Sequence, residues 1–292
     1  MDRDALTIRF WQIAILVTGL AIWQWGYDLR AIAALKPFVP GILDPYFVSK
    51  PSEIARGFLK LGCLADRGGT LLVFRPADIG ACLSDNPNNL WAALLVTLKN
   101  TFWGFVWGTG TGVAAGLVLG RSEMLARIFD PYIVAMNSIP RIALVPLIVL
   151  MFGLGDISKI VTAWTVVFFV VFFNTFEGTR AVDRDQIAAA RLLGASEWAI
   201  TRTVVVPSAL AWVFAALTPA VSFALIGVIV GEFIGAEFGI GKLIVEAEAR
   251  ASATDMMVAI LVLMVVGILL AVGVRKVQAY LLRWQPQFST QT

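Results

Sequence analysis

The sequence predicts an all-α membrane protein with about six transmembrane helices. Hydrophobic residues make up 59% of its 292 residues, whereas charged residues make up 15%. Mean hydropathy is +0.81, and apolar runs recur at the length that a bilayer requires. A soluble domain of this length could not bury so much apolar surface, so lipid must solvate part of it.

A helix needs about 20 apolar residues to cross a hydrocarbon core about 30 Å thick. The first segment of that length follows a short basic amino terminus. A signal peptide begins in the same way, but no small-residue cleavage site follows, and we interpret the segment as a span. The six predicted spans lie at about residues 10–28, 93–119, 131–152, 157–176, 207–231 and 255–274.

The basic residues near the spans predict the orientation of the chain. They form four clusters on one side of a six-span chain, and we expect that side to be cytoplasmic, with both termini inside. The net charge of +3 arises from these short clusters and not from a continuous basic face, so we expect no nucleic-acid partner. The clusters contain Arg3, Arg9, Arg121, Arg127, Arg180, Arg184, Arg191, Arg202, Arg275, Lys276 and Arg283.

Composition also excludes several chemistries. The chain has no His and only two Cys, which removes His-based acid–base chemistry and Cys/His zinc sites. It contains no G-x-x-x-x-G-K-[ST] phosphate loop, so it cannot hold ATP in the P-loop manner. We therefore expect that the chain is not an enzyme, and we assign it no catalytic, cofactor-binding or metal-binding residue.

The long segment 29–91 is expected on the periplasmic side. Within it, residues 51–61 predict an amphipathic helix, because a Pro and an early acid suit its first turn. Residues 62–89 are rich in Gly, Asp, Asn and Pro and predict an ordered loop or small cap. An oxidising compartment would favour a disulfide between Cys63 and Cys82; two unpaired thiols are the alternative.

The connection between the fourth and fifth spans takes about thirty residues, where a purely structural connector normally takes a few. Ala, Leu, Arg and Glu favour helix on both sides of Gly194, and this Gly can supply the backbone freedom for a sharp turn. We expect two short helices that form an elbow projecting from the membrane. Pro207 then suits the first turn of the fifth span, where its missing N–H is harmless.

Five motifs carry a resemblance to a known family. They are the loop pattern of Ala188-Ala189-Ala190, Gly194, Val204, Val206 and Pro207; Pro51-Ser52-Glu53-Ile54; Ser138-Ile139-Pro140-Arg141-Ile142-Ala143-Leu144-Val145-Pro146; Phe152-Gly153-Leu154-Gly155-Asp156-Ile157-Ser158-Lys159; and Glu232 followed by Gly239-Ile240-Gly241. Over most of residues 45–285 the chain resembles type I permeases of ATP-binding-cassette (ABC) importers. It is most similar to the binding-protein-dependent components for nitrate, taurine, aliphatic sulfonates and thiamine precursors.

The resemblance implies a bacterial inner-membrane, multi-pass permease that forms the path for a small anionic solute, such as nitrate, taurine, a sulfonate or a similar organic acid; a thiamine precursor is the alternative. It implies a homodimer in the bilayer, with two ATPase subunits that hold ATP and Mg, and with a periplasmic or lipid-anchored solute-binding protein. The loop would present a coupling helix to the ATPase through Asp183, Ala188, Ala189, Ala190, Arg191, Gly194, Ala195, Glu197 and Pro207. The family usually has Glu where Ala188 stands.

We expect four parts along the chain. They are an amino-terminal segment with the first span (1–28), a periplasmic segment with the amphipathic helix and an inserted loop (29–91), a permease core of five spans (92–285) and a cytoplasmic tail (286–292).

The third span predicts part of a translocation path. Pro140 and Pro146 interrupt its hydrogen-bond ladder, so the freed carbonyls must face protein or water. Arg141 lies near the middle of the span, where an unpaired charge costs at least about 2.5 kcal/mol, so it should face the bundle interior or a hydrated cavity. It is a candidate anion contact; an ion pair with Glu177 or a snorkelling side chain is the alternative.

Three further residues are candidates for lining the path. Asn174 and Ser222 are polar groups within spans, but such groups also join helices by hydrogen bonds. Glu232 ends the fifth span, where it could line a gate or form a solvated helix end. Gly residues at 104, 108, 112 and 116 repeat every four residues, which favours close helix packing first and a subunit interface second.

Two other classes of function compete with the importer. A membrane-embedded enzyme would use Arg141, Glu177 and Glu232 as polar machinery, but no Ser/Lys, paired-Asp or metal-ligand set recurs at functional spacing. A secondary transporter would show an inverted repeat and intramembrane acids. The long charged loop at 178–206 distinguishes an importer permease from both classes, because neither a membrane enzyme nor a secondary transporter needs such a loop.

Overall fold

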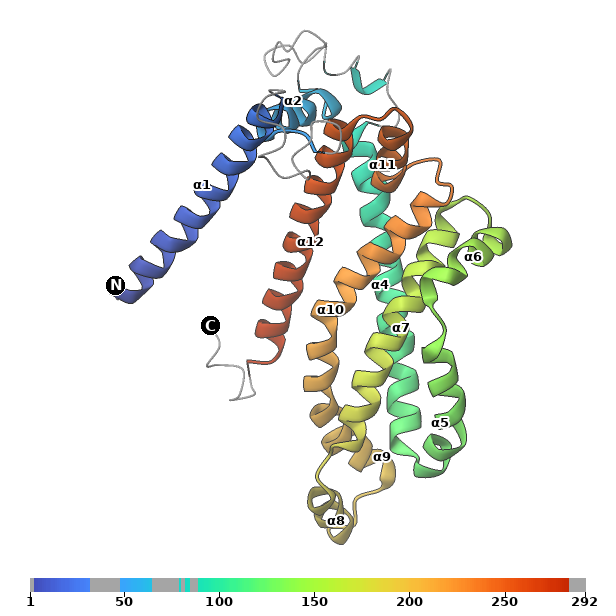
Figure 1. Cartoon of the computed structure of the whole chain (residues 1–292). Helices are drawn as coiled ribbons and strands as arrows, with labels where there is room; N and C mark the ends of the chain where they lie inside the picture. Colours follow the sequence, from blue (N-terminus) through green and yellow to red (C-terminus); the bar gives the residue numbers. More distant parts are fainter. Residues whose placement is uncertain (1–2, 32–47, 65–78, 80–81, 85–88, 284–292) are drawn as a thin grey trace. The chain divides into compact units, whose positions relative to one another are not determined.

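The computed structural model describes residues 3–31, 48–64, 79, 82–84 and 89–283 (Figure 1). These residues form helices, and no strand occurs among them, which confirms the predicted all-α class. The helices are α1 (Arg3–Ala31), α2 (Pro51–Leu61), α4 (Leu90–Arg121), α5 (Glu123–Ser138), α6 (Val145–Phe152), α7 (Asp156–Arg180), α8 (Arg184–Leu192), α9 (Glu197–Ile200), α10 (Val206–Phe233), α11 (Ile240–Ala249) and α12 (Ala253–Leu281).

By their contacts the residues form two compact units, and each is described by itself. One unit contains Met1–Ala93 and Lys242–Leu263, and the other contains Leu94–Gly241 and Met264–Thr292. The second unit holds most of the long apolar helices and the predicted coupling loop. It is therefore the unit that positions the candidate site.

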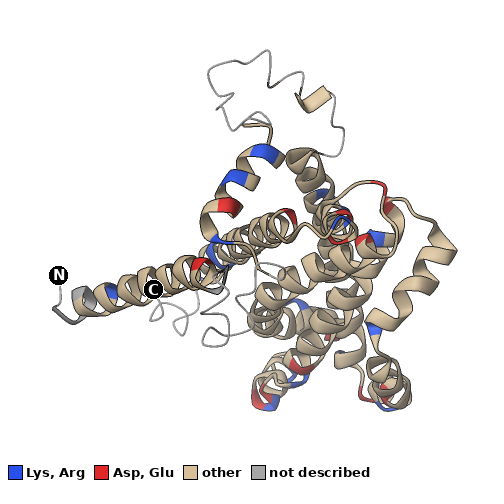
Figure 2. Cartoon of the chain, turned by 45° about the horizontal axis from the view of Figure 1, so that its top comes forward, with Lys and Arg blue, Asp and Glu red and all other residues tan. Residues whose placement is uncertain are grey.

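Four helices of the described chain are long and apolar enough to cross a membrane, and a bent pair makes a fifth if it is counted as one span. They coincide with five of the six predicted spans. In Figure 2 the ribbon colours of the charged residues gather near helix ends, with long tan stretches between them. The first predicted span is the helix α1, but α1 is not among the four, so its crossing of the membrane stays a prediction.

The third predicted span differs from the expectation. It begins at Glu123 and is broken into α5 and α6, whose axes are bent by 79°. The break falls at Ile139 and Pro140, where the Pro supplies no N–H to the helix, and a single 3₁₀ turn, Arg141–Leu144, leads into α6. The predicted interruption at Pro146 is wrong. This Pro occupies the first turn of α6, where it disrupts no hydrogen bond.

Helices α4 and α7 pack closely along the glycine stripe of α4. The four predicted glycines of α4 and also Gly120 face α7, at positions where an added Cβ would collide with Ala163, Val167, Phe168, Thr175 or Thr179. The stripe therefore packs two helices of one chain, as the first of the two interpretations expects. Val167 and Val171 also pack with Ala216, Ala220 and Ala224 of α10, so α7 is the central helix of this core.

We predict that Gly108→Ala destabilises the protein by about 1–3 kcal/mol, because a Cβ there would lie 2.6 Å from the Cβ of Val167 and would overpack the contact. Gly110 is the matched control in the same helix, since an added Cβ would meet nothing within 4 Å. Thermal unfolding of detergent-purified protein, followed by Trp fluorescence, measures both. Equal midpoints for the two Ala variants would contradict the close packing.

The first unit contains the predicted amphipathic helix with the predicted bounds, Pro51–Leu61. Its Gly57 approaches α12 so closely that an added Cβ would lie 3.0 Å from Thr254 and Val258. The Oγ of Ser49, just before α2, lies 2.8 Å from the hydroxyl of Thr254. These contacts fix the start of α2 against the first turns of α12.

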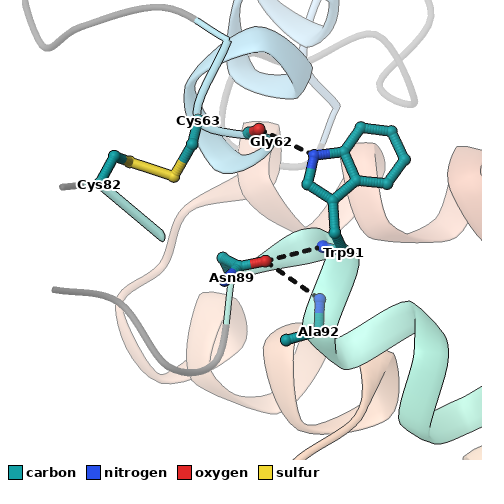
Figure 3. The surroundings of a disulfide bond; sticks show 6 residues. All are labelled: Gly62, Cys63, Cys82, Asn89, Trp91 and Ala92. Carbon is teal, nitrogen blue, oxygen red and sulfur yellow. Dashed lines mark hydrogen bonds between the residues drawn. A yellow bond between two sulfur atoms is a disulfide. The ribbon is translucent and has the colours of Figure 1, made fainter. Parts of the chain in front are cut away.

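The end of α2 is tied to the start of α4 in the same unit (Figure 3). A disulfide joins Cys63 to Cys82, with Cα atoms 5.9 Å apart. The Trp91 indole Nε1–H donates to the carbonyl of Gly62 at 2.8 Å, and Asn89 caps α4 by accepting from two backbone N–H groups. Of the two alternatives for the cysteines, the structure has the disulfide. Most of the predicted loop at 62–89 lies outside the described residues.

Candidate coupling site and translocation path

The predicted elbow is formed by α8 and α9 at the ends of α7 and α10 (Figure 1). Asp183 and Ser196 cap the two helices by accepting from backbone N–H groups, which satisfies donors that a helix start leaves free. Between the helices, Gly194 has a φ of +81°, in the left-handed region that favours glycine. Its N–H donates to the Arg191 carbonyl at 2.9 Å, and that of Ala195 donates to the Ala190 carbonyl at 3.1 Å. The expectation of two short helices around Gly194 is confirmed.

The elbow has a small core of its own. Val182, Ile200 and Val205 are buried together, and Ile187, Ala190, Ala195 and Val204 pack against them. The chain then passes through a π-helical turn, Thr201–Val205, into α10, where Pro207 occupies the first turn as predicted. α9, this turn and α10 are continuous, so the elbow leads directly into a long apolar helix.

An ion bridge joins the elbow to α4. The Glu197 carboxylate accepts from Arg191 of α8, at 2.9 Å, and from Arg121 at the end of α4. Arg121 also donates through Nε to the hydroxyl of Thr201 at 3.2 Å. Exposed ion pairs are individually weak, but this network links three segments and fixes how α8 stands relative to the bundle.

Three large apolar side chains of the elbow are strongly exposed. Leu192 is 90% exposed, Leu193 is 89% exposed and Trp198 is 73% exposed. Together these three side chains are called the elbow tip. Exposed large apolar side chains on a well-packed projection are typical of protein interaction surfaces.

Arg141 lies in the second region of interest, at the break between α5 and α6. Its guanidinium stacks on the ring of Phe169, 4.6 Å from the centroid, and donates to Asn137. The alternative ion pair with Glu177 is not formed in the described structure. Arg141 borders a cavity of about 360 Å³, whose wall also includes Pro140, Thr162, Val166, Phe223 and Gly227. The structure therefore brings Pro140 and Arg141 together at one cavity.

The other path candidates do not join that cavity. The Asn174 amide donates to the carbonyl of Val170 in its own helix, at 2.8 Å, and Ser222 is half-buried on α10. Glu232 is 1% exposed, so the alternative of a solvated helix end is wrong. Its carboxyl accepts from the Thr97 hydroxyl and from the Gly241 N–H, both at 2.8 Å.

Sequence reasoning missed a polar cluster at the start of α7. Asp156 accepts from Lys99, at 2.7 Å, and from Asn100, at 3.1 Å. Lys159 is 2% exposed and donates to the carbonyls of Leu154 and Gly155. The partners are far apart in sequence, so no local motif could have revealed them. Among the described residues, no cluster of His, Cys, Asp and Glu could hold a metal ion.

Long apolar helices and a two-helix elbow between two of them define the class as a polytopic membrane protein with a projecting element between two spans. The family model for the binding-protein-dependent transport system inner membrane component matches residues 108–284. The chain belongs to this family and is a permease component of an ABC importer.

Curated relatives support the assignment over about two thirds of the chain. The putative aliphatic sulfonates transport permease protein SsuC of Bacillus subtilis is 29% identical, over 68% of this chain and 72% of the relative. The riboflavin transport system permease protein RibX of Chloroflexus aurantiacus is 31% identical, over 67% and 73%. The taurine transport system permease protein TauC of Escherichia coli is 30% identical, over 67% and 71%.

The fold is similar to that of a solved transporter. An inward-facing structure of the MetNI methionine ABC transporter aligns with a TM-score of 0.58 and 22% identity, covering 65% of this chain and 95% of the matched chain. The type I importer permease fold expected from the sequence is confirmed.

Proposed function

We propose that the elbow is the element through which this permease is driven by a separate ATPase subunit. The observation that carries the proposal is the exposed elbow tip on an elbow that is otherwise well packed. The tip would fill an apolar groove on the ATPase, and the continuity of α9 with α10 would turn closure of the ATPases into movement of a span. ATP and Mg would be held by the ATPase, and the chain itself would need no cofactor.

The assembly follows from this role. Two copies of the permease would enclose the path in the bilayer, with one ATPase on each elbow and a periplasmic or lipid-anchored solute-binding protein on the other side. The disulfide supports the orientation, because disulfides persist in oxidising compartments. If α4 crosses the bilayer once between the disulfide-bearing segment and the elbow, the elbow would lie in the cytoplasm, and we propose that both termini lie there too.

We predict that Ala at all three positions of the elbow tip reduces recovery of the ATPase with the tagged permease about tenfold or more. Each large apolar side chain contributes about 1.5–3 kcal/mol when it is fully buried, and 1.4 kcal/mol is a factor of ten. Co-purification from membranes in detergent, with mass spectrometry and an ATPase assay, measures the loss.

Leu150→Ala is the control for that experiment, since Leu150 of α6 is 83% exposed but lies outside the elbow. It should leave ATPase recovery unchanged. Full recovery with the triple variant would remove the proposed docking role. A permease that never carries a P-loop ATPase would favour the secondary transporter or the membrane enzyme.

We also propose that the cavity at the α5–α6 break belongs to the solute path and that Arg141 contacts a small anion, such as nitrate, taurine, a sulfonate or a similar organic acid. A guanidinium held against a ring and an amide is already oriented, which limits the ordering cost of binding. Asn174 and Ser222 are proposed to line other parts of the path. Glu232 is not, because it is buried in the protein.

We predict that Arg141→Gln raises the KM for uptake about tenfold, because one charge-assisted hydrogen bond contributes about 1.5–3 kcal/mol. Uptake of nitrate, taurine and ethanesulfonate into vesicles that contain the whole transporter measures the change. Arg275→Gln is the charge-matched control on α12 and should keep the wild-type KM. An unchanged KM for a transported anion in Arg141→Gln would contradict the contact.

A further inference from the structure

A second cavity, of about 390 Å³, lies behind the elbow and has a strongly basic wall. We call it the arginine cavity. Its four arginines come from the ends of α4 and α7 and from α8; they are Arg121, Arg180, Arg184 and Arg191. The wall also includes Gly120, Glu123, Thr179 and Ala188. The cavity shares Arg121 and Arg191 with the ion bridge of the elbow, but binding of an anion in it is not part of the proposed coupling.

The basic wall follows from the helical period of α8. Its residues on the cavity are Arg184, Ile187, Ala188 and Arg191, spaced i, i+3, i+4 and i+7, so they share one face of the helix. The cavity therefore lies between this face of α8 and the ends of α4 and α7.

The charges of the cavity are not balanced by the protein. Four guanidinium groups stand against two carboxylates, that of Glu123 on the wall and that of Glu197, which bridges two of the arginines. The arginines of the wall therefore outnumber these carboxylates. Glu123 is also paired with Arg127, at 2.8 Å. Arg184 forms no ion pair within the described part of the chain.

Ala188 leaves the space in which a carboxylate could have balanced this charge. It is exposed in the middle of the basic face of α8 and contributes only a methyl group. The start of α5, whose first turn includes Glu123, borders the same cavity and adds the positive end of a helix. An anion at this place would meet guanidinium forks from three helices.

We propose that the arginine cavity binds a phosphate group. Guanidinium forks match the oxygens of phosphate in pairs, and the excess of arginines over carboxylates favours an anion that carries more than one charge. The volume exceeds that of phosphate alone, so the group belongs either to a soluble phosphate compound or to the headgroup of an anionic lipid. A bound phosphate would tie α8 to α4 and α7 and hold the elbow in one position; only this last consequence rests on the proposed coupling function.

Phosphate binding is tested on the full permease, purified in detergent without any ATPase. Titration calorimetry with inorganic phosphate tests the soluble source. Native mass spectrometry after extraction from nanodiscs of phosphatidylcholine, with or without phosphatidylglycerol, tests the lipid source. The variants are Ala188→Glu, which adds the missing carboxylate, and Arg184→Gln, which removes the unpaired charge. Their matched controls are Ala188→Gln and Arg202→Gln, since Arg202 belongs to the same loop but not to the cavity wall.

We expect wild type to bind inorganic phosphate or to retain phosphatidylglycerol, and either result identifies the source. Ala188→Glu and Arg184→Gln should each weaken that binding about tenfold, because charge-assisted hydrogen bonds contribute about 1.5–3 kcal/mol. Both controls should bind as wild type does. Binding of neither probe, or an equal loss in Arg202→Gln, would overturn the proposal. Since no ATPase is present, failure here is separate from failure of the docking role.

Discussion

Gly194→Val is expected to lower transport-coupled ATP hydrolysis about tenfold while the permease still inserts in the membrane. Gly194 has a φ of +81°, and an added Cβ would meet nothing within 4 Å. Space is therefore available, and the whole penalty is conformational. The left-handed region costs an L-residue about 1–2 kcal/mol, and a β-branched side chain is the least tolerant of it. The turn would relax and move α8 away from α9.

Gly194→Asn separates this cause from any other effect of the substitution. Asn adopts the left-handed conformation more readily than other non-Gly residues, so this variant should keep most of the wild-type activity. The measurement is ATPase activity of the reconstituted transporter with and without solute-binding protein and solute. If the Val and Asn variants lost activity equally, the backbone conformation would not be the cause. If the Val variant kept full stimulated activity, the elbow would have no coupling role.

The elbow could be predicted in detail because its determinants are local. Gly and Pro constrain the local backbone in any context, as Gly194 and Pro207 do here. The residues between them have clear helix propensity. The same holds for α2, where a Pro and an early acid define the first turn. Five of the spans were also predictable, since length and hydropathy alone identify them.

Features that depend on distant partners could not be predicted. The two prolines of the third span look equivalent in sequence, but only Pro140 breaks the helix, because the second helix begins just before Pro146. The third span also begins earlier than predicted, at Glu123. Helix α11 was missed as well, since its ten residues are too few for a span and its amino-terminal partner lies on α10.

The contact between Glu232 and the start of α11 could not be predicted from the sequence. Sequence places this acid at the end of an apolar helix, which suggests solvent or a gate. In the structure a fold of the chain brings Gly239 and Gly241 onto the carboxyl group, and a Cβ at Gly241 would lie 2.6 Å from the Glu232 Cβ. Glycine is required there because a side chain would push the backbone N–H out of hydrogen-bond range. The sequence shows the motif with Gly239 and Gly241, but it does not show that these glycines accommodate the Glu232 side chain.

Glu232→Ala should destabilise the protein by about 3 kcal/mol or more, the largest loss that we expect from a single substitution. The carboxyl group accepts from the Thr97 hydroxyl and the Gly241 N–H, and Thr97 in turn accepts from the Ile240 N–H at 3.0 Å. Truncation would leave these donors buried without an acceptor, at about 1–3 kcal/mol each, and would open a cavity beside them.

Glu232→Gln keeps the volume and one acceptor oxygen, so its loss should be smaller than that of the Ala variant. Glu248→Ala is the control on α11, because Glu248 is exposed. Thermal unfolding in detergent and the fraction of monodisperse protein after size exclusion measure all three. Similar midpoints for the Ala variants at 232 and 248 would mean that the buried carboxyl group does not hold the first turn of α11. A midpoint for Glu232→Gln between wild type and Glu232→Ala is expected, because the network needs an acceptor at this place and the amide supplies half of it.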